Sequence, residues 1–281
     1  MNFHQSIRAS TPFRVFTMAV AVFCLVGVIG GSAAAQSSGG CQMAPATVGQ
    51  LSAAAAISTR LRDYLENTGA ELAIIARVGS DQRDRGLKYT HAGLVWRDHP
   101  KGPWTVVQEL NECGTGRSDI FDQGLMQFFL DDPFNYDVQV IVPTAELRRS
   151  LVAILATGDG RRVHEPRYSV ISYPRSTLYQ NSNEWVLEVI AMAQGRLRNL
   201  AVLNRADAQR LHAALGFRGT RVKVGFFEQL FGGLFKANVS FSDHPPGAFS
   251  HGWFEFVSVR SIREYLARQN QVASVRDLIA Q

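Results

Sequence analysis

The chain has 281 residues, of which 46% are hydrophobic and 19% are charged, a length sufficient for one well-formed hydrophobic core. Its formal net charge of +5 is mild, and its lysines and arginines are scattered along the sequence. The sequence therefore predicts no nucleic-acid partner, because such partners require clustered basic surfaces.

The N-terminus has the pattern of an export signal. Arg8 and Arg14 precede an apolar run at residues 15–31, which is too short and too rich in small residues to favour a membrane span. The following "SAAAQ" offers an Ala-x-Ala cleavage site after Ala35. Residues 1–35 are therefore predicted to be a signal peptide of a periplasmic protein, with a retained N-terminal anchor as the alternative.

Cleavage after Ala35 would remove Cys24 and leave two cysteines, Cys41 and Cys113. Two cysteines in an exported protein predict one disulfide between them, although their spacing cannot exclude two unpaired thiols. Cys113 is a weak candidate for a catalytic nucleophile, because it follows a strand pattern and opens no clear helix.

The first half of the chain alternates between helix and strand patterns. Residues 36–48 are rich in Ser, Gly and Pro and predict a flexible lead-in. An Ala-rich helix then ends at Gly69. Hydrophobic periodicity and turn residues predict the next elements: strands at 71–78, 88–96 and 104–110, a helix at 120–130, a strand at 135–142 and a helix at 144–158.

In the second half, an irregular stretch leads into a helix that opens with "QNSNEWV" and carries an apolar face up to Ala193. Gly195 stands where a helix C-cap is expected. The patterns then predict a helix at 205–217, strands at 220–227, 235–241 and 252–259, and a helix at 262–269. Ser261 and Glu264 form a predicted capping box for that last helix.

Hairpin-spaced strands with helices grouped around them predict an α+β fold. The mature chain is expected to form a single domain at 49–281. We expect its core at about 70–195 and a strand-rich C-terminal extension at about 196–281.

Three motifs, in order, resemble a known family: "YTHAGLVW", a strand ending in a carboxylate, and a helix entered through "QNSNEWV". They are similar to circularly permuted papain-like proteins, which are relatives of NlpC-type peptidases and of lecithin:retinol acyltransferase. The resemblance covers roughly Leu72 to Gln194 and implies a permuted papain-like core with a mostly antiparallel sheet. The whole chain also resembles an uncharacterised family of exported bacterial proteins, a domain of unknown function.

The resemblance implies roles for polar residues of two strands. His91 takes the place of the general base, since Gly93 and Leu94 match the rest of its motif. Glu109, or less favourably Gln108, takes the place of the residue that orients the imidazole. Such a base needs a third group on its far ring nitrogen.

Ser182 falls on the position of the family's cysteine nucleophile, where the helix dipole and unpaired backbone N–H groups would assist it. Asn181 or those N–H groups would hold the oxyanion of an amide or ester hydrolase or acyltransferase. A hydroxyl is far less acidic than a thiol of pKa ~8.5, so serine puts catalysis in doubt. Asn181 and Glu184 are also an ordinary N-cap pair, which would make Ser182 a plain first-turn residue.

The alternative function is an inactive binding module that grips a peptide or acyl chain with aromatic side chains, namely Trp185, Tyr179 and Trp96. The candidate partners are cell-wall peptides, lipidic acyl groups and protein tails. A structural accessory protein without any functional cleft is a third hypothesis.

No cofactor or metal is predicted. The histidine pairs His91 with His99 and His244 with His251 match no compact ligand motif. Membrane contact has only weak support, because the apolar stretch 224–235 is more typical of a core segment than of a lipid-facing loop.

Overall fold

The computed structural model describes residues 45–83, 86–131, 133–223, 238–248 and 251–280. The predicted signal peptide, Cys41 and the apolar stretch 224–235 lie outside the described residues. Within the described ranges, no helix combines the length and the apolar character needed to cross a bilayer.

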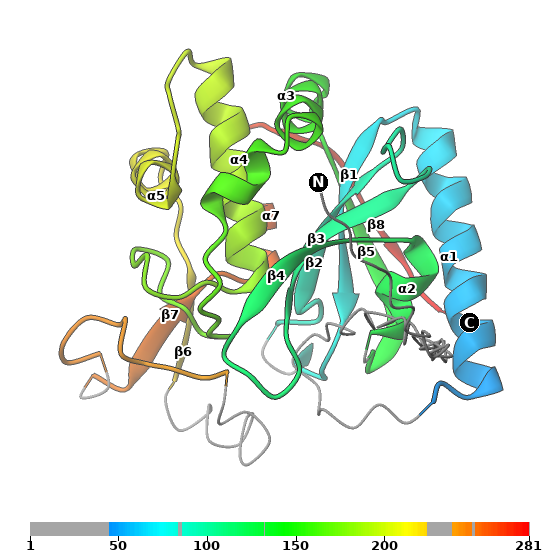
Figure 1. Ribbon diagram of the computed structural model, residues 1–281, viewed down its shortest axis with the longest axis horizontal. Helices are drawn as coiled ribbons and strands as arrows, with labels where there is room; N and C mark the ends of the chain where they lie inside the picture. The colour runs from blue at the N-terminus through cyan, green and yellow to red at the C-terminus, as the bar shows by residue number, and fades with distance from the viewer. Residues whose placement is uncertain (1–44, 84–85, 132, 224–237, 249–250, 281) are drawn as a thin grey trace, which may run out of the picture. The chain divides into compact units, whose positions relative to one another are not determined.

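Six strands form one antiparallel sheet in the spatial order β4-β3-β2-β1-β5-β8 (Figure 1). Their bounds are β1 (Leu72–Val78), β2 (His91–Trp96), β3 (Thr105–Asn111), β4 (Ser118–Gln123), β5 (Asn135–Pro143) and β8 (Val272–Leu278). A second, two-stranded sheet pairs β6 (Thr220–Lys223) with β7 (Trp253–Phe256). The predicted α+β class is confirmed, since antiparallel strands are combined with packed helices.

Helices cover both faces of the six-stranded sheet (Figure 1). One face carries α1 (Val48–Thr68) and α2 (Leu125–Leu130), and the other carries α3 (Ala145–Ala156) and α4 (Ser182–Leu197). The 3-10 helix η2 (Asp159–Val163) follows α3, and both α5 (Arg205–Ala214) and α7 (Val259–Arg268) contact α4.

Strand alternation divides the hydrophobic core into two clusters, one on each face of the sheet. On β2, Ala92 and Leu94 pack in the cluster that contains α4, whereas Val95 packs in the cluster that contains α1. The same alternation decides which face each polar residue of β2 and β3 reaches.

The predicted N-terminal helix is confirmed with its stop signal. Thr47 caps α1 by accepting the Gln50 backbone N–H, and the Gln50 side chain accepts the Thr47 N–H in return. Gly69 ends the helix with φ of 63°, a left-handed conformation that glycine adopts without steric cost.

The helix predicted at 120–130 is wrong in its first half. Ser118–Gln123 form strand β4, in which Ile120 pairs with Glu109 of β3, and only Leu125–Leu130 are helical. Pairing with a distant strand overrides the local helix pattern here, and Gly124 separates the two elements.

Two predicted helix ends are also wrong. Gly195 lies inside α4, which continues to Leu197. The capping box of α7 joins Ser258 to Ser261, three residues before the expected position, because the helix already begins at Val259.

The C-terminal third differs from the expected strand-rich extension. Residues 238–241 form no strand, although 235–241 was predicted as one. The chain instead returns to the main sheet through β8, which pairs with β5 as an edge strand. Sequence patterns missed β8 because Leu278 is its one buried residue, so no hydrophobic alternation marks it.

Gly195 supplies a test of the packing at the end of α4. A Cβ atom added there would lie 2.6 Å from Val202 Cγ2 and 3.0 Å from the Leu200 carbonyl oxygen. We expect Gly195→Ala to lower the free energy of unfolding by about 1–3 kcal/mol, as overpacking does. Gly49→Ala on α1 is the matched control, since a Cβ there meets only Thr47 Oγ1 at 3.9 Å. Urea denaturation measures both variants, and equal stability of the two would contradict this packing.

Candidate functional site

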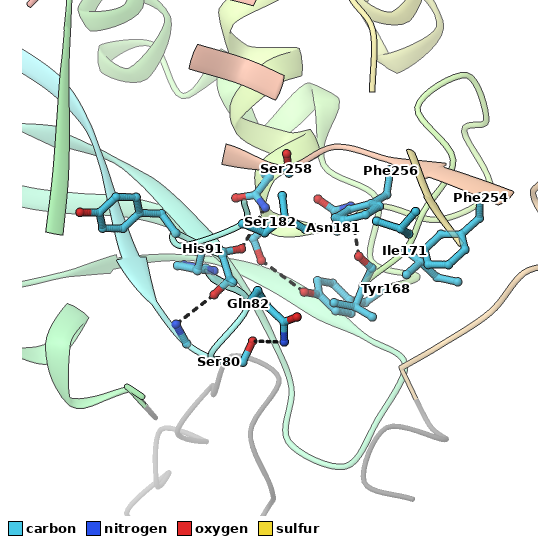
Figure 2. A pocket seen from close by; sticks show the side chains of 17 residues that line it. Ser80, Gln82, His91, Tyr168, Ile171, Asn181, Ser182, Phe254, Phe256 and Ser258 are labelled. Atoms are coloured by element: carbon cyan, nitrogen blue, oxygen red, sulfur yellow. Dashed lines mark hydrogen bonds between the residues drawn. The ribbon is translucent and has the colours of Figure 1, made fainter. Parts of the chain in front are cut away.

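A pocket opens at the N-terminus of α4 (Figure 2). The centre of a water-sized sphere can occupy about 80 Å³ of it, and the space between its atoms amounts to about 790 Å³ when the part open to solvent is counted. Three segments build most of its wall: the connection from β1 to the start of β2, the loop before α4, and the β6–β7 pair. The side chains that line it include those of His91, Tyr168, Val170, Ile171, Asn181, Ser182, Val222, Phe254, Phe256 and Ser258.

Asn181 is the N-cap of α4. Its Oδ1 accepts the Glu184 backbone N–H at 2.9 Å, and its amide donates to the Val170 carbonyl at 3.4 Å. The capping alternative is therefore confirmed by geometry, and Ser182 is the first residue of the helix. The oxyanion role of Asn181 stays a prediction.

Asn183 fastens the first turn of α4 to β2. Its Oδ1 accepts the Ala92 N–H at 3.0 Å, and its Nδ2 donates to the Thr90 carbonyl at 3.0 Å. These two backbone groups flank His91, so Asn183 brings the N-terminus of α4 to the strand that carries the histidine. Sequence reasoning missed this residue; its one signal was an amide side chain in the first turn of a helix, where Asn can bond backbone groups.

Gln108, and not Glu109, holds the imidazole of His91. His91 Nε2 lies 2.7 Å from Gln108 Oε1, and Gln108 in turn donates to Gln123 Oε1 at 2.6 Å. Burial, and then the positive charge of Arg77, lowers the pKa of His91 to about 3. The ring is therefore neutral, and protonating it would place a second cation beside a guanidinium.

His91 and Ser182 line the same pocket, but their side chains do not meet. The His91 ring lies 6.0 Å from that of Phe128 on α2, on the face of the sheet opposite to α4. Ser182 Oγ instead lies 3.3 Å from the Tyr168 hydroxyl. No hydrogen bond joins Ser182 to His91 in the described part of the chain, because β2 alternation turns the imidazole away.

Glu109 lies on the α4 face of β3 and makes no contact with His91. Its Oε1 accepts the Ser118 hydroxyl at 2.7 Å, and Ser118 Oγ lies 3.2 Å from His164 Nε2. Burial raises the pKa of Glu109 to about 8. The sequence correctly predicted that a polar residue of β3 contacts His91. Because adjacent residues of a strand point to opposite faces, that residue is Gln108 and Glu109 points away.

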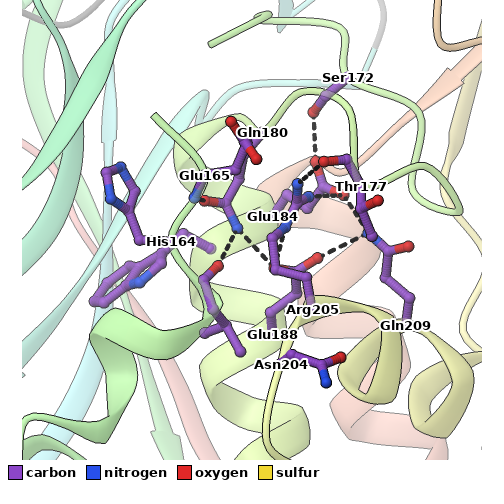
Figure 3. Close-up of polar contacts among 12 residues, drawn as sticks. His164, Glu165, Ser172, Thr177, Gln180, Glu184, Glu188, Asn204, Arg205 and Gln209 are labelled. Carbon is purple, nitrogen blue, oxygen red and sulfur yellow. Dashed lines mark hydrogen bonds and ion pairs between the residues drawn. The ribbon is translucent and has the colours of Figure 1, made fainter. Parts of the chain in front are cut away.

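Behind the pocket, two glutamates of α4 share one arginine of α5 (Figure 3). Arg205 Nη2 lies 3.0 Å from Glu184 Oε1, and Arg205 Nε lies 2.8 Å from Glu188 Oε2. Gln209 adds a donor to each carboxylate. Burial raises the pKa of both glutamates, against the opposing effect of the Arg205 charge.

The same cluster anchors the loop that forms one wall of the pocket. The Ser172 hydroxyl donates to Glu184 Oε2, and the Gln180 amide donates to Glu188 Oε2 at 2.7 Å (Figure 3). Tyr168 and Ile171, which line the pocket, lie in the loop next to these two anchors. Hydrogen bonds therefore hold the loop that forms this wall of the pocket to the buried carboxylates of Glu184 and Glu188.

The three aromatic residues expected to grip a ligand do not line this pocket. Trp185 is buried, and its indole donates to the Gly160 carbonyl at 3.0 Å. Trp96 is buried with its ring 5.0 Å from that of His99, and the Tyr179 hydroxyl accepts one hydrogen bond from Ser242. Trp185 and Trp96 occupy apolar helix and strand positions, which point into the core, whereas Tyr179 lies in the loop before α4. The lining Tyr and Phe residues are Tyr89, Tyr168, Phe254 and Phe256.

In the described ranges, no group of three His, Cys, Asp or Glu side chains could hold a metal ion. Cys41 lies outside those ranges, so its disulfide with Cys113 stays a prediction.

Fold and site together define an α+β protein with a pocket at a helix N-terminus. A profile of the family described as "Uncharacterized protein conserved in bacteria (DUF2145)" matches residues 64–266, and the chain belongs to that family. The expected membership of an uncharacterised bacterial family is confirmed. Neither a search of curated proteins nor a search of solved structures found a match.

The buried carboxyl of Glu109 predicts a pH-dependent stability. Its pKa in the folded state, about 8, exceeds the ordinary value of 4.5, so its contribution is complete below pH 4.5 and is lost as pH rises through 8. We expect Glu109→Gln to reduce the fall in unfolding free energy over this window by up to about 1.4 kcal/mol per pH unit. Glu146→Gln, at an exposed position of α3, is the control. Identical slopes for Glu109→Gln and wild type in urea titrations would refute the assignment.

Proposed function

We propose that this protein is a non-catalytic binding module of the bacterial envelope. Its pocket at the N-terminus of α4 takes an uncharged peptide segment or an acyl chain. The observation that carries the proposal is the chemistry of the lining: none of the described residues around the pocket is an Asp, Glu, Lys or Arg.

The lining has two parts. Aliphatic and aromatic side chains form the wall: Leu87, Val170, Ile171, Val222, Phe254 and Phe256. Hydroxyl and amide groups surround the helix N-terminus, including those of Ser182, Asn181 and Ser258. An apolar wall with a few convergent polar groups is typical of small-ligand sites, and here a ligand carbonyl could meet those donors (Figure 2).

The arrangement argues against catalysis by Ser182. A serine nucleophile needs a base within hydrogen-bond distance, and the Ser182 hydroxyl contacts Tyr168 instead. His91, the candidate base that lines the same pocket, is buried beside Arg77, which disfavours the imidazolium that proton transfer would create.

The envelope location and the ligand class extend the sequence predictions. A chain exported after Ala35 would meet cell-wall peptides, lipidic acyl groups and protein tails in the periplasm. Uncharged parts of these molecules suit the pocket best, because charged groups entering it would lose hydration without gaining a partner of opposite charge.

The second candidate is the hydrolase or acyltransferase of a permuted papain-like fold. One observation favours it: Ser182 and His91 line one pocket, and a side chain of the next strand orients the imidazole through Nε2. In that case Ser182 would attack an amide or ester after a rearrangement that brings His91 to its hydroxyl.

A serine-directed fluorophosphonate probe separates the two candidates. We expect no labelling of Ser182 in the folded protein, whereas a known serine hydrolase in the same reaction is labelled. Labelling of Ser182 that disappears in His91→Ala would overturn the proposal and establish the hydrolase.

Filling the pocket tests binding itself. Fluorescence titration with N-phenylnaphthylamine, an uncharged apolar probe, is expected to show saturable binding to wild type. Val170→Trp, which places an indole at the pocket wall, should weaken binding at least tenfold. Val239→Trp is the matched control, since Val239 packs in the same small cluster but does not line the pocket. Equal binding by both variants, with folding verified by circular dichroism, would contradict the assignment of the pocket.

A further inference from the structure

The last residue of α4 and the connection from α4 to α5 (Figure 1) carry three exposed leucines, at the end of α4 opposite to Ser182. The exposed fractions of Leu197, Leu200 and Leu203 are 42%, 51% and 58%. Single exposed apolar residues are ordinary, but three of them within seven residues concentrate the apolar surface in one place. We refer to residues 196–203 as the leucine loop.

The exposure of these leucines is built into the backbone. Asn199 adopts a left-handed conformation with φ of 56°, and the Leu200 N–H donates to the Gly195 carbonyl at 2.9 Å. Val202 is buried between the leucines, and the Leu203 N–H donates to Asp207 Oδ2 at 3.0 Å. The loop is thus tied at both ends and in its middle, which leaves the leucines pointing outward.

Cations surround the leucines. Arg196 and Arg198 are exposed, and neither makes an ion pair within the described residues. Arg149 of α3 shares a surface recess with Arg196 and Leu197, which also contains the carboxylate of Glu146. The loop therefore presents apolar side chains inside a surface with an excess of positive charge.

We propose that the leucine loop docks this protein on a lipid bilayer that contains anionic headgroups. The leucines enter the boundary between headgroups and acyl chains, while Arg196 and Arg198 contact the phosphates, as interfacial elements of mixed apolar and basic character do. The charge favours an anionic bilayer over an uncharged one. Spaced leucines beside two arginines suit a fluid surface, which needs no matching pocket.

Docking by this loop sets the orientation of the pocket. The 16 residues of α4 span about 24 Å at ~1.5 Å per residue, and Ser182 lies at the far end of that helix. The protein would therefore hold its pocket away from the bilayer surface.

Co-sedimentation with lipid vesicles tests the proposal. The protein is purified in the form its host produces, and mass spectrometry determines its N-terminal residue. We expect binding to phosphatidylcholine vesicles that contain phosphatidylglycerol, and weaker binding to phosphatidylcholine alone. Leu200→Ser/Leu203→Ser should weaken binding to both vesicles at least tenfold. Arg196→Gln/Arg198→Gln should weaken only binding to the anionic vesicles, by about fivefold for each arginine, and remove its salt dependence.

Matched controls lie on α1, where Val48→Ser/Leu51→Ser and Arg60→Gln/Arg62→Gln remove the same kinds of exposed side chain. Both should bind as wild type does, so that any contribution of the N-terminal segment is common to all variants. Unchanged binding by the leucine variant, or no vesicle binding by wild type, overturns the proposal. Loss of self-association in the leucine variant, seen by analytical ultracentrifugation without any vesicle effect, would assign the loop to a second copy instead.

Discussion

The arrangement of α4, α5 and the pocket wall depends on one buried cation. Arg205 lies between Glu184 and Glu188 in a site that excludes water, and each carboxylate also binds a neutral side chain of the loop before α4. Such a cluster is stable only when every member is present, because a lone charge left in the interior costs several kcal/mol. The position of the pocket wall therefore depends on this ion cluster being intact.

A second constraint is the two-residue repeat of the strands. Gln108 and Glu109 are neighbours in sequence, yet one reaches the imidazole of His91 and the other reaches Ser118 on the opposite face. The strand order brought His91 close to the start of α4, while the repeat turned its ring away from Ser182. Proximity along the sheet and proximity of reacting atoms are thus separate properties in this fold.

The sequence predicted the elements whose patterns are strong and local. Helix α1 has a capping pair and a glycine stop, and β1, β2, β3 and β5 are short apolar runs bounded by turns. The sequence could not predict β4 and β8, because both are defined by their partner strands rather than by their own periodicity. Asn183 was missed for a related reason: its role depends on backbone groups 91 and 93 residues away in the sequence.

Much of the pocket was also beyond sequence reasoning. Tyr168 and Ile171 come from an irregular loop, and Phe254 comes from a short strand of the second sheet. Segments without periodicity give no indication of which cavity they reach. Only the residues at the start of β2 and α4 were marked beforehand, through a resemblance and not through a pattern.

Asn183 has a consequence for how a ligand could enter. By bonding both backbone groups beside His91, it joins the beginning of α4 and the beginning of β2 into one stiff corner. A guest larger than the resting cavity must be accommodated elsewhere, and the opposite wall is made of Phe254 and Phe256 on a two-stranded ribbon. If the pocket binds a ligand as proposed, the largest ligand would be set by the movement available to these two aromatic rings, and the polar end of the cavity would keep its shape.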